Sequence, residues 1–529
     1  MLFRSQTAYE RALADPEVFA VSLSEYIALG DWRLFFLDRN KLDQLKPDEI
    51  DAAASRYFVR DNRVLGTFVP EDSPQRAVIT AAPSASELLA NFKAPAKGDA
   101  GEVFDTSHDN LNRRTRRLNF GDLKVALLPK KNRGQTVNVA MSFHWGDLDA
   151  LSKRDMAGSL AMAMLARGTE QLNRQEIDDE LTRLKIRGGL SHFETTRDKL
   201  PEALRLVATL LRDASFPAAE FAELKRQTLT ALQAQLDNPQ ELSRDALAAH
   251  FNTYPPGDPR YHAPLAERIE QLREATLEQV VDYHRDLIGT ARGEIAIVGD
   301  FDEKAVEQEL GRLFPGYVSR SPYARVDREF RAVSPQRIVI DTPDKENAFV
   351  RARLDLRLRQ DDADAPALYV ANDIFGGTAG LSSRLIDRLR QQDGISYSVG
   401  SSLSIGNRER LSTWVFAAMA APQNVSRAEQ AFLDELARAR RDGFTAAEVS
   451  EAKKGILEAR AVARSQDSAV AGNWLSFLDL DRDWQFSKDF EDKVMALTPE
   501  QVNAAFRKYI DPEQLTLVVA ADASKARPD

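Results

Sequence analysis

The sequence of 529 residues contains no cysteine. This absence excludes disulfide bonds, zinc sites with thiolate ligands, iron–sulfur clusters and cysteine nucleophiles. It does not fix the cellular compartment, because a chain without cysteine is stable in either redox environment. Any chemistry that the chain performs must therefore use other side chains.

Long apolar runs are also absent. A membrane-spanning helix needs roughly 18 to 20 apolar residues, and the run from Leu160 to Leu165 is soon interrupted by Arg167 and Glu170. At the N-terminus, charged residues stand where the apolar centre of a signal peptide would lie; these are Glu10, Arg11, Asp15 and Glu17. We expect no membrane span and no signal peptide within this chain.

An excess of basic residues is missing as well. The 71 lysines and arginines are outnumbered by 81 aspartates and glutamates, which gives a formal net charge of −10. This charge argues against a nucleic-acid-binding domain and against a basic membrane-binding patch. Hydrophobic residues make up 43% and charged residues 29% of the chain, as in ordinary soluble globular proteins. The length predicts about three and a half domains of roughly 150 residues.

What the sequence does contain is an internal repeat. Asp31-Trp32 recurs 452 positions later as Asp483-Trp484, and a middle copy runs from Glu278 to Leu287. Each copy predicts a helix followed by a short strand, at Val64 to Val69, Glu294 to Val298 and Leu515 to Ala520. Six further residues of the first copy recur at the same offset without a gap: Lys41, Leu45, Pro47, Ala52, Ala53 and Tyr57.

A second element repeats independently of the first. The segment from Phe216 to Lys225 matches that from Phe444 to Lys453, 228 positions later, so the repeating unit is about 225 residues long. We expect residues 1–72 to be the end of one unit and residues 107–322 and 323–529 to be two complete units. Residues 73–106, with several prolines and glycines, predict an exposed linker between them.

The predicted elements give the fold class. Strands are expected at Leu123 to Leu128 and Val137 to Phe143, and helices at Met156 to Ala166, Ala218 to Leu236 and Ala428 to Arg440. Strands neighbour one another in sequence before long helical stretches. This order favours an α+β fold, with mainly antiparallel sheets packed with helices, over a parallel sheet of βαβ units.

Metal, nucleotide and serine-hydrolase motifs are weak. No two of the six histidines are three or four positions apart, so only a cluster without a sequence pattern could bind zinc; they are His108, His144, His192, His250, His262 and His284. Gly376-Gly377-Thr378-Ala379-Gly380 could cradle a phosphate, but it lacks the lysine of a P-loop. A turn that lets a helix pack closely on a sheet is the favoured interpretation. No serine lies in a G-x-S-x-G elbow.

The most suggestive stretch runs from Ser382 to Val399. It predicts a helix from Ser382 to Arg390, a stop at Gly394, and a strand from Ile395 to Val399. Local physics explains the two conspicuous side chains without a function: Arg390 would favour the last helical turn, and Tyr397 would be a half-buried strand aromatic. A functional role remains the alternative.

This stretch resembles the C-terminal part of the pitrilysin and insulinase group of zinc metallopeptidases, the M16 family. The residues that carry the resemblance are Ser382-Ser383-Arg384-Leu385, Leu389-Arg390 and Gly394 with Ser396-Tyr397-Ser398-Val399. The duplicated units match the architecture of the family, whose fold is shared with LuxS and the mitochondrial processing peptidase. Full-length members have two homologous halves, each of two α+β units, around a chamber that admits unfolded peptides. The resemblance makes residues 1–72 the end of a second unit, residues 107–322 a third and residues 323–529 a fourth.

The resemblance also indicates what this chain lacks. In the family, the catalytic zinc lies on an inverted H-x-x-E-H helix of the first unit, together with a distal glutamate. An alignment anchored on Gly168-Thr169 places Ser159, Met162 and Ala163 at the His, Glu and His positions. The distal ligand would fall near Thr230 or Ala231. We therefore expect this chain to bind no metal and zinc to be held by a missing or partner half.

The fourth unit matches the family better. Members carry an arginine and a tyrosine seven positions apart, and Arg390 and Tyr397 stand at that spacing. The resemblance implies that these residues hydrogen-bond the substrate backbone and stabilise the oxyanion. The expected function is that of the non-zinc-binding C-terminal half of a metalloendopeptidase, acting on unfolded peptides with an N-terminal half that carries H-x-x-E-H. The alternative is an inactive scaffold subunit. The location would be periplasmic if a full-length parent is exported.

Overall fold

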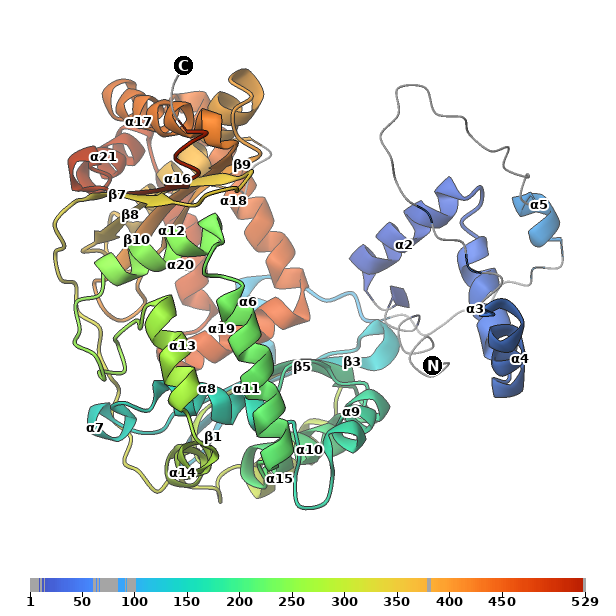
Figure 1. The fold of residues 1–529 in the computed structure, drawn as a ribbon. Coiled ribbons are helices and arrows are strands. Elements are labelled where there is room, and N and C mark those ends of the chain that lie inside the picture. Colours follow the sequence, from blue (N-terminus) through green and yellow to red (C-terminus); the bar gives the residue numbers. More distant parts are fainter. Residues whose placement is uncertain are drawn as a thin grey trace.

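The structure is a computed structural model, and it describes residues 15–59, 84–90, 101–377 and 382–526 with a few isolated positions before residue 93 (9, 12, 13, 63, 66 and 92). Figure 1 shows a main body built from the residues after 101 and a smaller group of helices to one side of it. Among the described helices, none combines the length and the apolar character that crossing a bilayer requires.

The first sheet of the main body has six strands in the order β1-β2-β6-β3-β5-β4. Strands β2 and β6 are parallel, and the other neighbouring pairs are antiparallel. The three central strands are rich in Val, Ile, Leu and Ala, as expected for strands covered on both faces. The bounds are β1 (Arg116–Phe120), β2 (Asp122–Pro129), β3 (Thr136–Phe143), β4 (Arg187–Gly188), β5 (His192–Thr196) and β6 (Arg292–Gly299).

The second sheet has five strands in the order β7-β11-β8-β10-β9. Strands β7 and β11 are parallel, and the other neighbouring pairs are antiparallel. The bounds are β7 (Arg337–Asp341), β8 (Ala348–Leu356), β9 (Ser398–Ser404), β10 (Ser412–Ala420) and β11 (Thr516–Ala521).

The two sheets have the same topology once the edge strand β1 is set aside. In chain order, the five remaining strands of the first sheet correspond to the five strands of the second, and the first and last strands of each set form the parallel pair. The predicted α+β fold, with repeated and mainly antiparallel sheets, is confirmed.

Helices cover one face of each sheet. The apolar cluster on the first sheet includes α8 (Asp155–Met164), α10 (Leu200–Arg212), α11 (Ala218–Gln233), α13 (Leu265–Glu274), α14 (Leu277–Leu287) and α15 (Glu303–Leu313). The cluster on the second includes α16 (Ala365–Gly376), α17 (Val425–Asp442), α18 (Ala446–Ser465), α20 (Trp484–Ala496) and α21 (Pro499–Tyr509). Two short helices, α7 (Leu148–Leu151) and α9 (Arg174–Arg183), accompany the first sheet. The helices predicted at Met156, Ala218 and Ala428 are thus present.

The inner face of each sheet is covered by a helix that comes from the other unit. Helix α12 (Pro239–His250) follows the first-sheet helices in sequence but packs on β7, β8 and β11 of the second sheet. Helix α19 (Asp467–Asp479) belongs to the unit of residues 323–529 and packs on β2, β3 and β6 of the first sheet. Both lie between the sheets in Figure 1. Trp474 and Phe477 of α19 join Leu128 and Val298 in a buried cluster, so the two units cannot separate without exposing it.

The smaller group contains α2 (Pro16–Ala28), α3 (Leu34–Gln44) and α4 (Pro47–Tyr57), with the short α5 (Ala85–Leu88) nearby. Its helices begin at local signals, such as the side chain of Asp15, which caps α2. The strand expected at Val64 to Val69 lies outside the described residues, apart from Gly66, as does most of the predicted linker. The end of that linker is fixed to the main body, where Glu102 N–H donates to Lys131 O and α6 (His108–Arg114) contacts α20.

Candidate functional site

Helix α8 shows what stands at the expected zinc position. Its buried face includes Gly158, which packs so closely on Tyr283 that a Cβ would lie 2.7 Å from the ring. On the opposite face Ser159, Met162 and Ala163 are all exposed. The three positions predicted to replace His, Glu and His therefore share one open face, as i, i+3 and i+4 spacing requires.

This face cannot hold a zinc ion. A serine hydroxyl, a thioether and a methyl group do not form the His and carboxylate set that zinc needs. On α11, Thr230 and Ala231 are also exposed, and the hydroxyl of Thr230 donates to the carbonyl of Arg226 in its own helix. The residues at the family's metal position thus do not fit the metal, and no catalytic step can be assigned to them.

The stretch from Ser382 to Val399 has a local structure that differs from the predicted one. The helix begins at Arg384 and continues as a π-helical segment, η3 (Ile386–Gln392). At Gly394, φ is +62°, and the N–H groups of Ile395 and Ser396 then donate to Leu389 O. These bonds keep Ile395 out of the sheet, so β9 begins at Ser398 and not at Ile395 as predicted.

The three arginines of this stretch differ in their surroundings. The guanidinium of Arg384 is buried against Glu448, with N···O distances of 2.6 and 2.9 Å. Burial by itself would raise the pKa of Glu448, but hydrogen bonds from Arg384 and Thr445 outweigh it and lower the pKa to about 2. Arg388 pairs with Asp393 at 3.1 Å. Both therefore have structural partners.

Arg390 and Tyr397 differ from these neighbours. Arg390 lies in the last turn of η3, as local physics predicted, but its side chain is exposed. Tyr397 is 68% exposed, so the prediction of a half-buried strand aromatic is wrong. Its backbone N–H is held by Met419 O at 3.0 Å, while the buried Leu389 and Ile395 anchor the segment beneath. Within the described chain, neither the guanidinium nor the phenol forms an ion pair or hydrogen bond.

The glycine run before this stretch packs a helix on the sheet. A Cβ at Gly376 would lie 2.5 Å from Ser401 Oγ and 2.6 Å from Leu385 Cδ1, and one at Gly377 would lie 2.6 Å from Asp373 Cα. The glycines thus let the end of α16 approach β9, which is the interpretation favoured over a phosphate cradle. Thr378, Ala379 and Gly380 lie outside the described residues.

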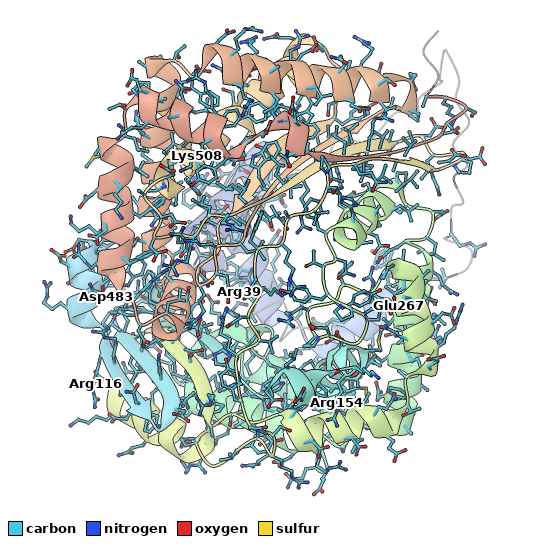
Figure 2. All side chains as sticks on the ribbon, turned by 90° about the vertical axis from the view of Figure 1, so that its left-hand side faces the viewer. Arg39, Arg116, Arg154, Glu267, Asp483 and Lys508 are labelled. Carbon is cyan, nitrogen blue, oxygen red and sulfur yellow. The ribbon has the colours of Figure 1, made fainter. Side chains whose placement is uncertain are left out.

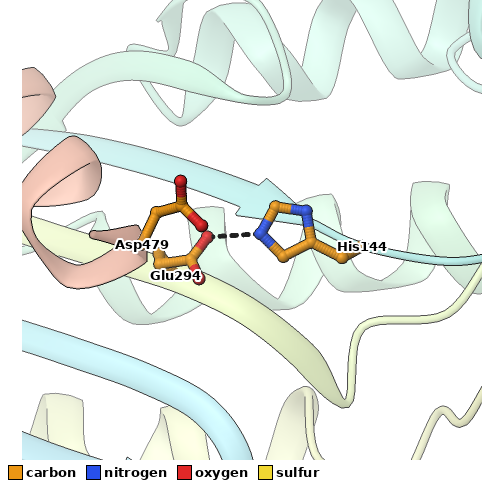
Figure 3. A group of neighbouring side chains, drawn as sticks. All are labelled: His144, Glu294 and Asp479. Carbon is orange, nitrogen blue, oxygen red and sulfur yellow. Dashed lines mark hydrogen bonds and ion pairs between the residues drawn. The ribbon is translucent and has the colours of Figure 1, made fainter. Parts of the chain in front are cut away.

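A side-chain cluster that no sequence motif indicated lies at the junction of the two units. Figure 3 shows His144, just after β3, Glu294 of β6 and Asp479 at the end of α19. One potential ligand atom of each lies within 4.8 Å of the others, and His144 Nε2 is 2.7 Å from Glu294 Oε2. These residues are 150 and 185 positions apart, so only the exchange of α19 onto the first sheet brings them together.

Comparison with known proteins agrees with this geometry. Residues 274–456 match the family model described as the peptidase M16 inactive domain. The C-terminal part of the chain is an M16-like domain. The match begins at the end of α13, crosses the segment that holds Arg390 and Tyr397, and ends within α18.

Relatives of known sequence include proteins named as zinc proteases and one named as a probable inactive metalloprotease. The chain is 27% identical over 335 residues to an uncharacterized zinc protease of Mycobacterium bovis, covering 62% of this chain and 73% of the relative. It is 23% identical over 209 residues to a probable inactive metalloprotease of Bacillus subtilis, covering 39% of this chain and 47% of the relative.

Solved structures share the M16-like fold. A peptidase M16 inactive domain from Pseudomonas fluorescens superimposes with a TM-score of 0.67 at 20% identity, over 78% of this chain and 100% of that one. The periplasmic protease PqqL of Escherichia coli gives 0.60 at 15% identity, over 90% of this chain but only 51% of its own length.

Proposed function

We propose that this chain is the non-zinc-binding half of an M16-type metalloendopeptidase, which binds an unfolded peptide and assists its hydrolysis by a half that carries H-x-x-E-H. In this assignment residues 1–72 end a second unit, residues 73–106 form a linker, and residues 107–322 and 323–529 are the third and fourth units. Zinc would be held by the other half, on the same gene or a separate subunit.

The observation that carries this proposal is a contrast, within the matched M16 segment, between side chains that have partners and side chains that have none. Arg384 and Arg388 are tied to carboxylates, whereas Arg390 and Tyr397 are exposed and have no partner in the described structure. An unpaired guanidinium and phenol on a firmly anchored turn are free to meet a group that this chain does not supply.

The chemistry of the two groups suits peptide hydrolysis. A guanidinium and a phenol both donate hydrogen bonds, and neither needs to lose a proton to do so. Such donors stabilise negative charge that develops on a carbonyl oxygen during attack. The proposed role of Arg390 and Tyr397 is therefore to hold the substrate backbone and the developing oxyanion.

The small helical group supports the need for another half. Helices α2, α3 and α4 repeat α19, α20 and α21 at an offset of 452. In the main body α19 covers the sheet of another unit, and α21 packs on α16. The described chain offers α2 and α4 no such surfaces, and Phe58 is 90% exposed. A partner that supplies a further sheet with its covering helices would bury them.

Reconstitution tests the proposal. The chain is mixed with an N-terminal M16 half that carries H-x-x-E-H, and cleavage of a denatured polypeptide is followed with and without chelator. Replacing Arg390 by Ala together with Tyr397 by Phe should lower turnover by at least about 10²-fold, because one oxyanion donor alone contributes about 10²- to 10³-fold. A matched control, Arg388→Ala, should leave turnover nearly unchanged. Zinc-dependent cleavage by the isolated chain would contradict the proposal.

An inactive scaffold subunit is the second candidate. It is favoured by the similarity to a probable inactive metalloprotease. In that case the double variant would fold, would bind the other half as well as the wild type does, and would leave its activity unchanged. Circular dichroism and a binding titration alongside the activity assay separate this outcome from misfolding.

A further inference from the structure

We propose that His144, Glu294 and Asp479 form a binding site for a divalent metal ion of the zinc type, which fastens the end of α19 to the first sheet. The site lies on a different part of the fold from the exposed face of α8. The proposal rests on this chain alone and does not depend on the proposed peptidase role.

The geometry needs only small side-chain movements to hold a metal. Zinc binds imidazole nitrogen and carboxylate oxygen at roughly 2.0 to 2.2 Å, which places tetrahedral ligands roughly 3.3 Å apart. Here one ligand atom from each side chain lies within 4.8 Å of the other two, and the shortest separation is 2.7 Å. Rotation about the last side-chain torsions of Glu294 and Asp479 spans these differences.

The charges of the cluster favour a cation. The carboxylate of Glu294 is only 7% exposed and faces a second carboxylate, that of Asp479. Two close carboxylates, one of them buried, are unfavourable unless positive charge lies between them. Arg408 donates to Asp479 Oδ1 at 2.6 Å, but Oδ2 accepts no hydrogen bond from the described residues. That oxygen is available as a ligand.

The backbone holds the ligands in place before any metal binds. Strand pairing sets Ser142 opposite Glu294 and Phe143 opposite Gly293, and the N–H of His144 donates to Arg292 O at 3.1 Å. The imidazole stacks on the ring of Tyr323, with centroids 5.5 Å apart and 25° between the planes. Such support from neighbouring groups orients metal ligands and strengthens binding.

The matched position at the second sheet shows another way to fasten the exchanged helix. The repeat offset of 228 places Phe251, just after α12, at the position of Asp479. Phe251 lies under the guanidinium of Arg353, 4.2 Å from its ring centroid, and Arg353 pairs across the sheet with Thr516. A cation thus joins helix and sheet there through an aromatic ring. At the His144 cluster, the proposed metal ligands take the place of this cation–π contact.

The ligand set indicates the type of ion. One imidazole with two carboxylates suits zinc and similar first-row ions better than magnesium or calcium, which prefer oxygen ligands alone. Three protein ligands leave a fourth position for water. The side chains of His144 and Asp479 are 25% and 34% exposed, so an ion can enter from solvent.

Calorimetric titration of Zn²⁺ into the chelator-treated full chain tests the proposal. We expect one ion per wild-type chain, and a loss of affinity of more than about 100-fold for His144→Ala and for Asp479→Asn, since loss of a mere outer partner already costs about 10- to 100-fold. Zinc should also raise the thermal midpoint of the wild type and not that of Asp479→Asn.

Matched controls keep the test decisive. His262→Ala removes an exposed histidine that faces a single carboxylate, Asp245, at 3.5 Å, and it should leave zinc binding unchanged. Urea unfolding without metal shows whether each variant folds; Asp479→Asn keeps the shape of the side chain if His144→Ala does not fold. Absence of stoichiometric binding by the wild type, or binding that survives both substitutions, would overturn the proposal.

Discussion

Two groups of three helices have matching sequences and very different surroundings. Helix α4 (Pro47–Tyr57) shifted by 452 positions is α21 (Pro499–Tyr509), and α2 and α3 shifted in the same way overlap α19 and α20 with slightly different ends. Trp32 is 49% exposed, whereas its counterpart Trp484 is 1% exposed, and Phe58 is 90% exposed where Ile510 is fully buried.

The comparison separates what local sequence determines from what packing determines. Both copies form helices because each carries its own start signals; α4 and α21, for example, both have 11 residues and begin with Pro47 and Pro499. Burial depends on the rest of the unit: α21 packs on α16, and α19 on the first sheet. A copy without these neighbours keeps its helices but leaves an apolar face open.

Some matched positions of the two helical groups differ in residue type as well as in burial. Glu491 of α20 contacts His108, Arg460 and Arg464, which joins α20 to α6 and α18. The matching position of α3 is Arg39, a residue of opposite charge. Helix α3 therefore cannot use the same ionic contacts, and in the proposed assembly the surface that it packs on should have different charges.

Trp484→Ala should have the largest effect on stability. Truncating a fully buried aromatic removes apolar contacts and leaves a cavity, which costs about 3 to 5 kcal/mol of unfolding free energy. Trp484 lies among Trp474, Phe477 and Leu128 between the two units. Urea unfolding followed by circular dichroism should show a clearly lower midpoint.

Trp32→Ala is the matched control. Because Trp32 is half exposed and contacts Phe36 at its side, the unfolding free energy of the chain should change by only about 0.5 kcal/mol or less. Its effect should appear instead as weaker binding of the N-terminal half. A large loss of stability for Trp32→Ala would show that the small helical group is already packed, and the comparison would fail.

The sequence predicted much of the fold because its signals are local or repeated. The strands at Leu123 and Val137 and the helix at Ala218 follow from apolar periodicity, and the two similar sheets follow from the repeats. The exchange of α12 and α19 could not be predicted, since helix periodicity shows that one face is apolar but not which sheet covers it. The π-helical segment from Ile386 to Gln392, which includes the buried Leu389, was also missed, because the same apolar spacing predicts an ordinary α-helix.

Candidate site residues could be predicted only where they belong to a recognisable sequence motif. Arg390 and Tyr397 were singled out by the family resemblance, and their role stays a prediction, while local physics placed Tyr397 wrongly in a strand. The cluster of His144, Glu294 and Asp479 has no sequence pattern, because its members come from two units. Sequence analysis expected no metal on this chain, and a three-dimensional cluster of this kind was the exception that it left open.

Acidification should weaken the main body through Glu491. Burial by itself would raise the pKa of Glu491, but contacts with His108, Arg460 and Arg464 outweigh it and lower the pKa to about 2 from the usual 4.5. A carboxylate whose pKa is lowered by folding stabilises the protein above its unfolded pKa. This contribution should be complete above pH 4.5 and be lost as the pH falls toward about 2.

Unfolding midpoints measured across that pH range check this prediction. Glu491→Gln should be less stable than the wild type at neutral pH, by less than Trp484→Ala, and should show a flatter decline on acidification. Arg39→Gln, at the matching position of α3, should leave the pH profile unchanged. Parallel profiles for the wild type and Glu491→Gln would assign the acid sensitivity to other carboxylates, such as Glu448, whose pKa is also lowered to about 2.

The smallest difference should come from the aspartates that precede α20 and α3, each of which accepts a hydrogen bond from the backbone N–H two residues later. Asp483 accepts a hydrogen bond from Gln485 N–H at 2.8 Å, and Asp31 accepts one from Arg33 N–H at 2.8 Å. Figure 2 labels Asp483 at the start of α20, on the main body. Asp483→Ala should lower the unfolding free energy by about 1 kcal/mol, because fraying of α20 disturbs the core that Trp484 joins.

Asp31→Ala should remove a similar local hydrogen bond, two residues before the N-cap position of α3, without moving the main unfolding transition. Its hydrogen bonds with Arg33 lower the pKa of Asp31 to about 2, so this contact is complete at neutral pH, yet the helix that follows contributes little to the shared core. Hydrogen exchange should become faster in the first turn of α3 alone. If both substitutions shift the main transition equally, the two copies are equally well packed, and the surroundings do not differ as the structure indicates.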